Sequence, residues 1–152
     1  MSMFSAFNVN ASGMTAQRYR MDIISENVAN ANTTRTEDGT PYRRKVVTFA
    51  EKGGQTPFSR VLGDASNTYN RGYSGNGVKV SRVYEDTQTE MNMVYDPSHP
   101  DADENGYVTY PNVNIVTEMT NLIDASRAYE ANATAFSASK SMALKGLQLS
   151  QQ

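Results

Sequence analysis

The strongest constraint on the fold is a pair of apolar stripes, one near each end of the chain. Their residues are spaced alternately three and four apart, which places them along one face of an α-helix. The stripe nearer the N-terminus contains Phe4, Phe7, Ala11, Met14, Arg18, Met21, Ser25 and Val28. The other contains Ile115, Met119, Leu122, Ser126, Tyr129, Ala133, Phe136, Lys140, Ala143 and Leu147. A seam with this 3.5-residue period is typical of helices that pack together as a coiled coil.

These stripes predict two long terminal helices, the first over about residues 5–31 and the second over about residues 113–145. At 1.5 Å per residue, the first helix would be roughly 40 Å long. An amphipathic helix on a globular core is the alternative interpretation, but the stripes are narrow and the second is longer than most globular helices. We therefore expect the helices to pair, with further neighbours covering what one partner leaves exposed. The roles of Arg18 and Lys140, which interrupt the stripes, stay open between setting the register and reaching solvent.

Capping and helix-breaking residues mark the boundaries. Either Asn112 or Asn114 is the expected cap of the second helix. Gly13 would cost the first helix about 1 kcal/mol relative to alanine, and the Asn and Thr side chains of residues 27–34 end that helix by competing for backbone hydrogen bonds. The expected parts are an N-terminal helix and Asn-rich junction (1–34), an extended insert (35–110) and a C-terminal helix (111–152), with both helices in one helical domain.

The insert is expected to be extended rather than helical, because its β-forming stretches alternate with turn-rich pieces. The expected short strands are 42–49, 77–84, 91–95 and 107–110. Residues 53–75 have little periodicity and predict a loop or a disordered arm in the free monomer. The fold class that follows is mainly α, with a coiled-coil-like helix pair and a small β and loop insert between the helices.

The composition argues against a conventional enzyme with a large core. Leu, Ile, Val and Phe together account for 26 of the 152 residues, which is below the roughly 20% at which a chain can easily offset its ordering entropy. The formal net charge is only −2, which does not suit plain disorder. We therefore expect the chain to order with the help of partners. It has no cysteine, which excludes disulfides, thiolate metal sites and cysteine nucleophiles.

Membrane and nucleic-acid partners are not expected. No apolar run approaches the roughly 18 residues of a membrane helix, and the first residues lack the basic and apolar regions of a cleavable secretory signal. Residues 43–45 form a basic triplet without an aromatic stacking array. Such a triplet indicates a solvated or interface face rather than a nucleic-acid site.

The loop around His99, the only histidine, is the candidate place for catalytic chemistry. This loop offers no oriented base beside a nucleophile, so no catalytic residue and no cofactor are expected. Residues 101–106 place Asp, Asp, Asn and Gly at positions 1, 3, 5 and 6 of a calcium loop, but Asn112 replaces the bidentate glutamate of position 12. A plain acidic turn is favoured, and a small calcium-binding module is the alternative.

Several motifs resemble those of a known family. Residues 27–34 (NVANANTT), directly after an apolar helix, are similar to the signature shared by bacterial flagellar rod, hook and hook-associated proteins. Residues 39–45 (GTPYRRK) resemble the proximal-rod branch. Three more segments resemble flagellar basal-body rod proteins of the FlgC family, namely 95–108 (YDPSHPDADENGYV), 111–119 (PNVNIVTEM) and 125–134 (ASRAYEANAT). Residues 51–71 match no motif, and whether they are ordered stays open.

The resemblance implies a structural subunit of the proximal rod, which polymerises into the periplasm-spanning drive shaft that transmits torque, without catalysis. In that family the terminal helices pair along the inner part of a helical tube and the insert contacts neighbouring subunits. The implied partners are other rod subunits, further copies of the chain, and the flagellar type III export apparatus, which exports subunits without a cleaved signal. The implied location is the flagellum basal body. Another axial component, such as a FlgB-like rod protein or a hook-associated protein, is the alternative.

The residues expected at the assembly interface lie on the two stripes and in the Asn-rich junction. They are Phe7, Met14, Met21, Asn27, Val28, Asn30, Asn32, Thr33, Ile115, Met119, Leu122, Tyr129 and Phe136. The large apolar members other than Met119 are expected to form a buried seam. The Asn and Thr members are expected to bind backbone groups where the helix ends and the chain turns outward.

Overall fold

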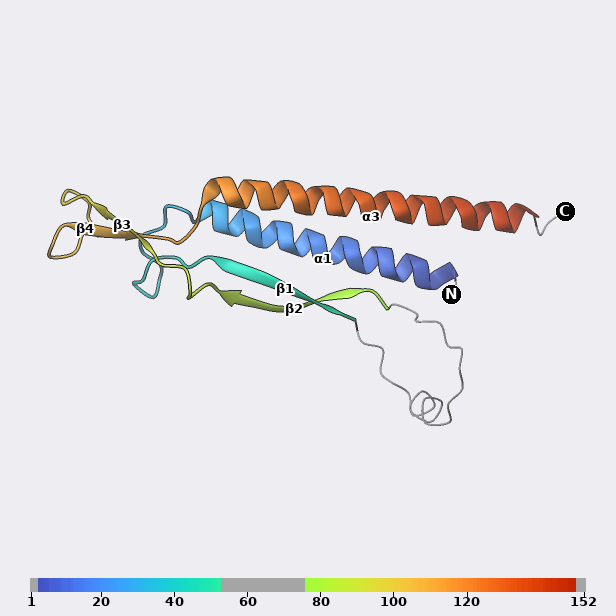
Figure 1. Ribbon diagram of the computed structural model, residues 1–152, viewed down its shortest axis with the longest axis horizontal. Coiled ribbons are helices and arrows are strands. Elements are labelled where there is room, and N and C mark those ends of the chain that lie inside the picture. The colour runs from blue at the N-terminus through green and yellow to red at the C-terminus, as the bar shows by residue number, and fades with distance from the viewer. Residues whose placement is uncertain (1–2, 53–75, 150–152) are drawn as a thin grey trace, which may run out of the picture.

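The computed structural model describes residues 3–52 and 76–149. Its helices and strands are, in chain order, α1 (Met3–Ala29), β1 (Lys45–Glu51), β2 (Val78–Glu85), β3 (Asn92–Tyr95), β4 (Tyr107–Tyr110) and α3 (Ile115–Leu149). Two long terminal helices with small β elements between them are thus confirmed (Figure 1). The arm expected at residues 53–75 lies outside the described residues, as does most of the motif-free segment 51–71.

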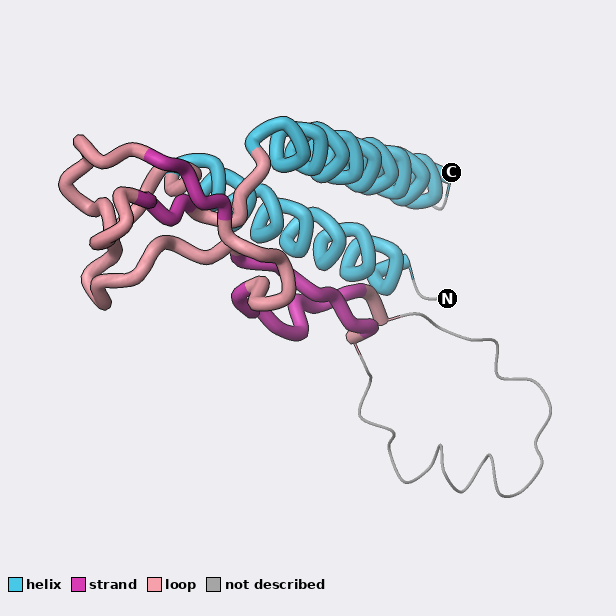
Figure 2. The backbone as a smooth tube through the Cα atoms, turned by 60° about the vertical axis from the view of Figure 1, so that its left-hand side comes forward, coloured by secondary structure: helices cyan, strands magenta, loops and turns pink. Residues whose placement is uncertain are grey.

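The molecule is elongated, and its two helices run antiparallel along the long axis (Figures 1 and 2). The antiparallel register is marked at one end by Phe7 and Phe136, whose ring centroids are 5.0 Å apart, edge to face. At the other end a hydrogen bond joins Asn27 to Glu118. The β1–β2 hairpin lies against α1, and the β3–β4 hairpin lies at the tip where α1 ends and α3 begins (Figure 1). The central element is therefore α1, which contacts both α3 and the first hairpin.

Small residues allow the helices to approach closely. Ala16 of α1 and Ala125 of α3 are buried. At Gly13, a Cβ atom would come within 2.6 Å of the Asn132 side-chain oxygen. The glycine that costs α1 helix propensity therefore makes room for a side chain of α3.

Each hairpin is a two-stranded antiparallel sheet. β1 pairs with β2 over its whole length, with an irregularity after Thr48, and Tyr95 of β3 lies opposite Tyr107 of β4. All four expected strands are present, but β1 begins at Lys45 and not at residue 42. The chain just before β1 is instead bound to the segment after α1, through the Tyr42 amide and the Thr33 carbonyl at 3.1 Å.

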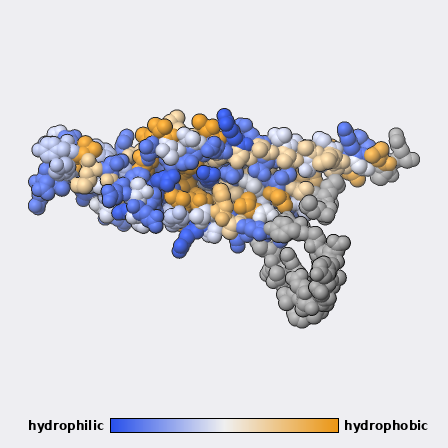
Figure 3. All heavy atoms as spheres, in the orientation of Figure 1, coloured by the Kyte–Doolittle hydropathy of each residue, from blue (hydrophilic) through white to orange (hydrophobic). Residues whose placement is uncertain are grey.

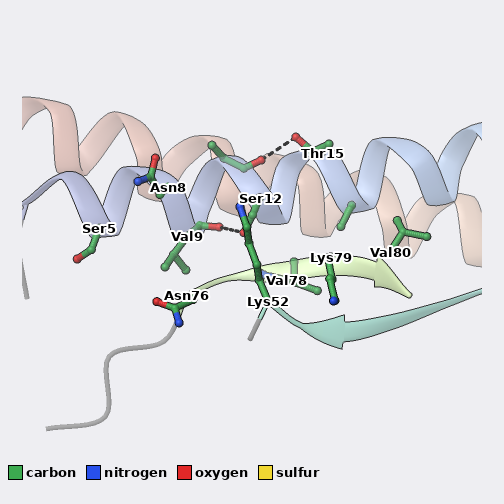
Figure 4. A pocket seen from close by; sticks show the side chains of 12 residues that line it. Ser5, Asn8, Val9, Ser12, Thr15, Lys52, Asn76, Val78, Lys79 and Val80 are labelled. Atoms are coloured by element: carbon green, nitrogen blue, oxygen red, sulfur yellow. Dashed lines mark hydrogen bonds between the residues drawn. The ribbon is translucent and has the colours of Figure 1, made fainter. Parts of the chain in front are cut away.

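Gly77 fits the start of β2 against α1. Its φ of +92° is in the left-handed region, and a Cβ atom would come within 2.1 Å of the Ser12 hydroxyl oxygen, so a side chain is excluded here. The Ser12 hydroxyl donates to the Val9 carbonyl at 2.7 Å and accepts from the Val78 amide at 3.0 Å (Figure 4). Ser12 thus ties α1 to the first hairpin.

α3 begins at Ile115, two residues later than expected, and Asn114 is its cap. The Asn114 side-chain oxygen accepts a 3.1 Å hydrogen bond from the Thr117 amide, as an N-cap side chain does. Of the two expected caps, Asn114 is confirmed. Asn112 has a different role, at the junction described below.

The described part of the chain has a thin apolar core. Its buried apolar residues are Ala16, Ile24, Ala31, Tyr42, Val108, Val113 and Ala125. Large apolar side chains are instead exposed along α3, among them Val116, Met119, Met142 and Leu149, and hydrophobic residues reach the surface there (Figure 3). Much of the apolar surface is therefore left uncovered in the single chain.

Candidate functional site

A buried polar cluster joins the helix pair to the extended insert. We call it the polar junction, and its members are Asn27, Tyr42, Arg44, Asn112 and Glu118. Asn27 is 1% exposed, and its amide nitrogen donates to the Lys45 carbonyl at 2.9 Å and to the Glu118 carboxylate at 3.0 Å. Its oxygen accepts from the Tyr42 hydroxyl and the Lys45 amide, both at 2.9 Å. These four bonds use the full capacity of an amide side chain, so Asn27 holds both β1 and α3.

Glu118 is a buried carboxylate, 1% exposed, whose charge is compensated by Arg44. One of its oxygens accepts from Arg44 Nε at 2.9 Å and Nη2 at 2.7 Å, and from Asn121 at 3.3 Å. The Arg44 guanidinium also lies 3.7 Å from the Asp86 carboxylate. Burial of a charge is costly unless the charge is paired and hydrogen-bonded. Arg44 therefore permits the burial of Glu118 in the first turn of α3.

Asn112 fastens three backbone segments at the junction. Its side-chain oxygen accepts from the Arg44 amide at 2.9 Å. Its amide nitrogen donates to the carbonyls of Asp86 at 2.9 Å and Thr89 at 3.2 Å. The segments before β1, after β2 and before α3 are thereby held by one side chain.

The Tyr42 hydroxyl is kept protonated by its surroundings. Burial raises its pKa to about 12, and the nearby carboxylates of Glu26, Glu85 and Glu118 act in the same direction. The hydroxyl therefore remains a donor to Asn27 up to a higher pH than an exposed tyrosine hydroxyl would.

The side chains of the Asn-rich segment (residues 27–34) differ in their hydrogen bonds and in their exposure. Asn30 donates to the Glu26 carbonyl at 3.0 Å and accepts from the Thr33 hydroxyl at 3.1 Å. Asn32 is exposed. Binding of backbone groups at the helix end is thus found for Asn27 and Asn30, and a role of this segment at an assembly interface stays a prediction.

The stripe residues are only partly covered in the single chain. Those that are half-buried are Phe7, Met14, Met21, Val28, Leu122, Tyr129 and Phe136. Ile115 and Met119 are 43% and 56% exposed in the single chain, because α1 covers only one face of α3. The interrupting residues Arg18 and Lys140 are both exposed. An assembly role for these residues stays a prediction.

Four members of the polar junction were not among the expected site residues: Tyr42, Arg44, Asn112, which was expected only as a possible helix cap, and Glu118. Arg44 belongs to a basic triplet that suggested a solvated or interface face. The position of Glu118 in the sequence was informative. It lies three residues after Ile115 and four before Leu122, on the face of the apolar stripe. A carboxylate on a helix face that packs against a neighbour predicts a cationic partner.

Two carboxylates of the acidic turn at residues 101–106 accept hydrogen bonds, one from outside the turn and one from the turn and the residue after it. Asp101 accepts from the Thr34 hydroxyl at 2.8 Å, and Asp103 accepts from the amides of Asn105 at 2.9 Å and Tyr107 at 2.8 Å. Within residues 3–52 and 76–149, no three His, Asp or Glu side chains are grouped so as to hold a metal ion. These contacts favour a structural acidic turn.

A groove of about 810 Å³ runs between α1 and the first hairpin (Figure 4). It is lined by serine, threonine, asparagine, alanine and valine side chains, and the charged groups along it are Lys52 and Lys79. General acid–base chemistry requires an oriented donor and acceptor pair, and two lysines of one charge do not provide it. The described lining of this groove therefore offers no acid–base pair.

Comparison with known proteins identifies both ends of the chain. The protein-family model described as "Flagella basal body rod protein" matches residues 7–35. A second family model, described as "Flagellar basal body rod FlgEFG protein C-terminal", matches residues 104–149. The flagellar basal-body rod protein FlgC of Bacillus subtilis (strain 168) is 46% identical over 153 residues, covering 98% of this chain and 99% of the relative. The chain belongs to the FlgC family of flagellar basal-body rod proteins.

Other FlgC proteins are similar over nearly the same length. FlgC of Borreliella burgdorferi is 46% identical and covers 93% of both chains. FlgC of Salmonella typhimurium (strain LT2) is 39% identical over 151 residues, covering 99% of this chain and all of the relative. As a FlgC-family member, the chain is a non-enzymatic structural subunit of the flagellar proximal rod. None of the described helices is long and apolar enough to cross a membrane.

The polar junction connects the two segments that match flagellar family models. Asn27 lies in the first segment and Glu118 in the second. Tyr42 and Arg44, which complete the contacts, lie between them. In this FlgC-family chain, the two terminal regions are thus joined through side chains of the insert.

Proposed function

We propose that this FlgC-family chain is a rigid link of the proximal rod that packs by heterologous contacts against further copies of itself and against other rod subunits. In a heterologous contact, one surface meets a different surface of the next subunit, so the array grows helically and does not close as a dimer. Exposed apolar residues along α3, including Ile115, Val116, Met119 and Ile123, support this proposal. Contiguous exposed apolar surface is typical of protein contact sites.

The single observation that carries the proposal is the polar junction. A drive shaft must pass torque between the helix pair and the insert without bending. Asn27, Asn112 and the Arg44–Glu118 pair hold the three segments that run between these parts. A fully satisfied buried network is rigid and selects one geometry, which is the property that a torque-bearing joint needs.

Export through the flagellar type III apparatus, without a cleaved signal, belongs to the same proposal. The thin core supports it, because a chain with few buried apolar residues has little free energy holding it folded before assembly. Subunit contacts in the rod would then supply the missing apolar burial. Stability of the subunit would depend on its neighbours.

The experiment is complementation of cells that lack this gene. Asn27→Ala is expected to be exported but absent from purified basal bodies, and the cells are expected to lose motility. Asn8→Ala, an exposed asparagine on the same helix, is the matched control and should incorporate normally. Deletion of residues 136–152 should also abolish incorporation, since it removes Phe136 and the end of α3. Normal motility with the deleted chain would contradict the proposal.

A further inference from the structure

Two Asn residues of this chain are followed directly by glycine, Asn76 and Asn105, and the structure holds these two pairs differently. Glycine after asparagine lets the backbone nitrogen approach the preceding side chain closely, because glycine has no side chain of its own. We propose that Asn76 is a site of spontaneous deamidation, and that the turn around Asp103 protects Asn105 from the same reaction. Deamidation at Asn76 requires only the folded chain, so it is independent of the proposed assembly.

The reaction takes place within one dipeptide and consumes only water. The Gly77 nitrogen bonds to Cγ of Asn76, the bond from Cγ to Nδ2 breaks, and the amide group leaves as ammonia with the proton of the Gly77 nitrogen. The resulting succinimide ring is then opened by water to aspartate, or to isoaspartate, whose main chain runs through Cγ. An intramolecular attack of this kind is fast only where the nitrogen can reach the carbon in the right orientation.

The Asn105–Gly106 peptide is fixed on both sides by Asp103. The Gly106 amide, which is the nitrogen that would attack, donates to the Asp103 carbonyl at 3.0 Å. The Asp103 carboxylate accepts from the Asn105 amide at 2.9 Å and from the Tyr107 amide at 2.8 Å. Gly106 is also buried. Attack on the Asn105 side chain therefore requires that this turn first open.

The charges beside Asn105 oppose the reaction as well. Asp103 and Glu104 directly precede it in the chain, and both are exposed. The attacking nitrogen becomes negative when it loses its proton, and the side-chain oxygen becomes negative as the new bond forms. Nearby carboxylates raise the energy of these anions, whereas nearby cations lower it.

Asn76 has the opposite electrostatic surroundings. It is exposed and lies two residues before β2, on the groove between α1 and the first hairpin (Figure 4). Of the groove-lining residues that the structure describes, the charged ones are Lys52 and Lys79. Glu51, which pairs with the first residue of β2, is not one of them. The two lysines therefore favour the anions that form during deamidation.

The hydrogen bonds near Asn76 hold the chain beyond the reacting nitrogen. The Gly77 carbonyl accepts from the Lys52 amide at 2.8 Å, and the Val78 amide donates to the Ser12 hydroxyl at 3.0 Å. Both bonds engage atoms that follow the Gly77 nitrogen, whereas in the other Asn–Gly pair the attacking nitrogen itself is engaged. These two bonds can stay in place while the Asn76 side chain approaches the Gly77 nitrogen.

Deamidation would change the contact between α1 and the first hairpin. A carboxylate at position 76 adds a negative charge to a groove whose described charged groups are lysines. Isoaspartate also lengthens the main chain immediately before Gly77, where a Cβ atom would already come within 2.1 Å of the Ser12 hydroxyl oxygen. The isoaspartate form is therefore expected to hold the hairpin less firmly against α1.

Peptide mass spectrometry of the purified full-length chain provides the test, because the two Asn–Gly pairs form an internal comparison. The chain is incubated at neutral pH, its helix content is checked by circular dichroism, and the amide and carboxyl forms of both peptides are quantified over time. Asn76 is expected to deamidate several-fold faster than Asn105. In guanidinium chloride, which unfolds the chain, the two rates should approach each other. Asn76→Gln should remove the product at position 76.

Asp103→Ala should raise the deamidation rate of Asn105 several-fold, because it removes the carboxylate that fixes the turn. The matched control is Glu104→Gln, which removes a neighbouring charge and leaves the hydrogen bonds of Asp103 in place, and its effect should be smaller. An unchanged Asn105 rate in the Asp103→Ala chain would refute the protective role of the turn.

Lys52→Gln combined with Lys79→Gln should lower the rate at Asn76, and an unchanged rate would refute the role given to the lysines. The proposed site itself is overturned if Asn105 deamidates as fast as Asn76 in the folded chain. It is also overturned if the ratio of the two rates is the same in the folded and the unfolded chain, since the fold would then have no influence on the reaction.

Discussion

The Asn27 side chain donates a 3.0 Å hydrogen bond to the Glu118 carboxylate, across 91 positions of sequence. This contact joins the last turn of α1 to the first turn of α3 and so sets the register of the antiparallel pair. Both side chains are 1% exposed. A hydrogen bond to a buried charge is stronger than one between neutral groups, and the two helices are therefore linked most firmly at the end next to the insert.

Asn27→Ala is expected to lower the free energy of unfolding by about 3 kcal/mol, because each buried polar group left without a partner costs about 1–3 kcal/mol. The groups concerned are the Lys45 amide and carbonyl and the Tyr42 hydroxyl. Urea unfolding of the purified chain, followed by circular dichroism, measures the change. Asn8→Ala should stay within about 0.5 kcal/mol of the unaltered chain, and equal effects of the two substitutions would contradict the role given to Asn27.

Arg44→Met is expected to destabilise the chain more than Glu118→Gln does. Loss of one partner of a buried ion pair costs roughly 3–5 kcal/mol, and the cost here is smaller because the Arg44 side chain is 26% exposed and partly screened. Arg44→Met leaves the Glu118 charge buried, whereas Glu118→Gln leaves Arg44 near Asp86 and solvent. Urea unfolding of both variants gives the comparison.

The double variant Arg44→Met with Glu118→Met provides the control for that comparison. It removes both charges and fills the space with apolar groups, which is often close to neutral for a buried pair. The double variant should therefore be more stable than Arg44→Met alone. Additive losses would show that the Arg44–Glu118 pair is not the origin of the effect.

The helix pair and the hairpins could be predicted because their signals are periodic or local. The spacing of apolar residues gave both helices to within a few residues, and the β-forming residues at 107–110 matched β4 (Tyr107–Tyr110). The cap at Asn114 could be expected from residue type and position alone. Such features depend on neighbours only a few positions away in sequence.

The polar junction could not be predicted in the same way, because its partners are far apart in sequence. Asn27 binds Tyr42 and Glu118, which are 15 and 91 positions away, and no periodicity connects them. Arg44 stands between two other basic residues, and only the fold decides which of the three turns inward. The exposure of Ile115 was equally hidden, since the stripe shows that a face is apolar but not which neighbour covers it.

Alkaline pH is expected to destabilise the fold through Tyr42. Its pKa is raised from 10.0 to about 12 in the folded chain, so the folded state holds this proton more strongly than the unfolded state. The contribution of this pKa shift to folding stability is complete below pH 10 and is lost as the pH rises from 10 to about 12. Melting temperatures measured across this range should fall. Tyr42→Phe should be less stable at pH 7, because the bond to Asn27 is lost, and should fall less steeply above pH 10.

Gly13 and Asn132 provide a test of how closely the helices approach. Gly13→Ala alone should destabilise the chain, because the new Cβ would lie 2.6 Å from the Asn132 side-chain oxygen. The Asn132 amide also donates a 2.7 Å hydrogen bond to the Ala128 carbonyl, so displacement of the side chain disturbs a second contact.

Asn132→Ala removes the obstacle, and in that background Gly13→Ala should stabilise the chain by up to about 1 kcal/mol, the helix-propensity difference between the two residues. Urea unfolding of the four proteins forms a double-mutant cycle, and its coupling term measures the contact directly. The effect of Gly13→Ala on stability changes from unfavourable to favourable in the Asn132→Ala background only if α1 and α3 touch at this point. A Gly13→Ala effect that is equally favourable in both backgrounds would mean that the helices are further apart there.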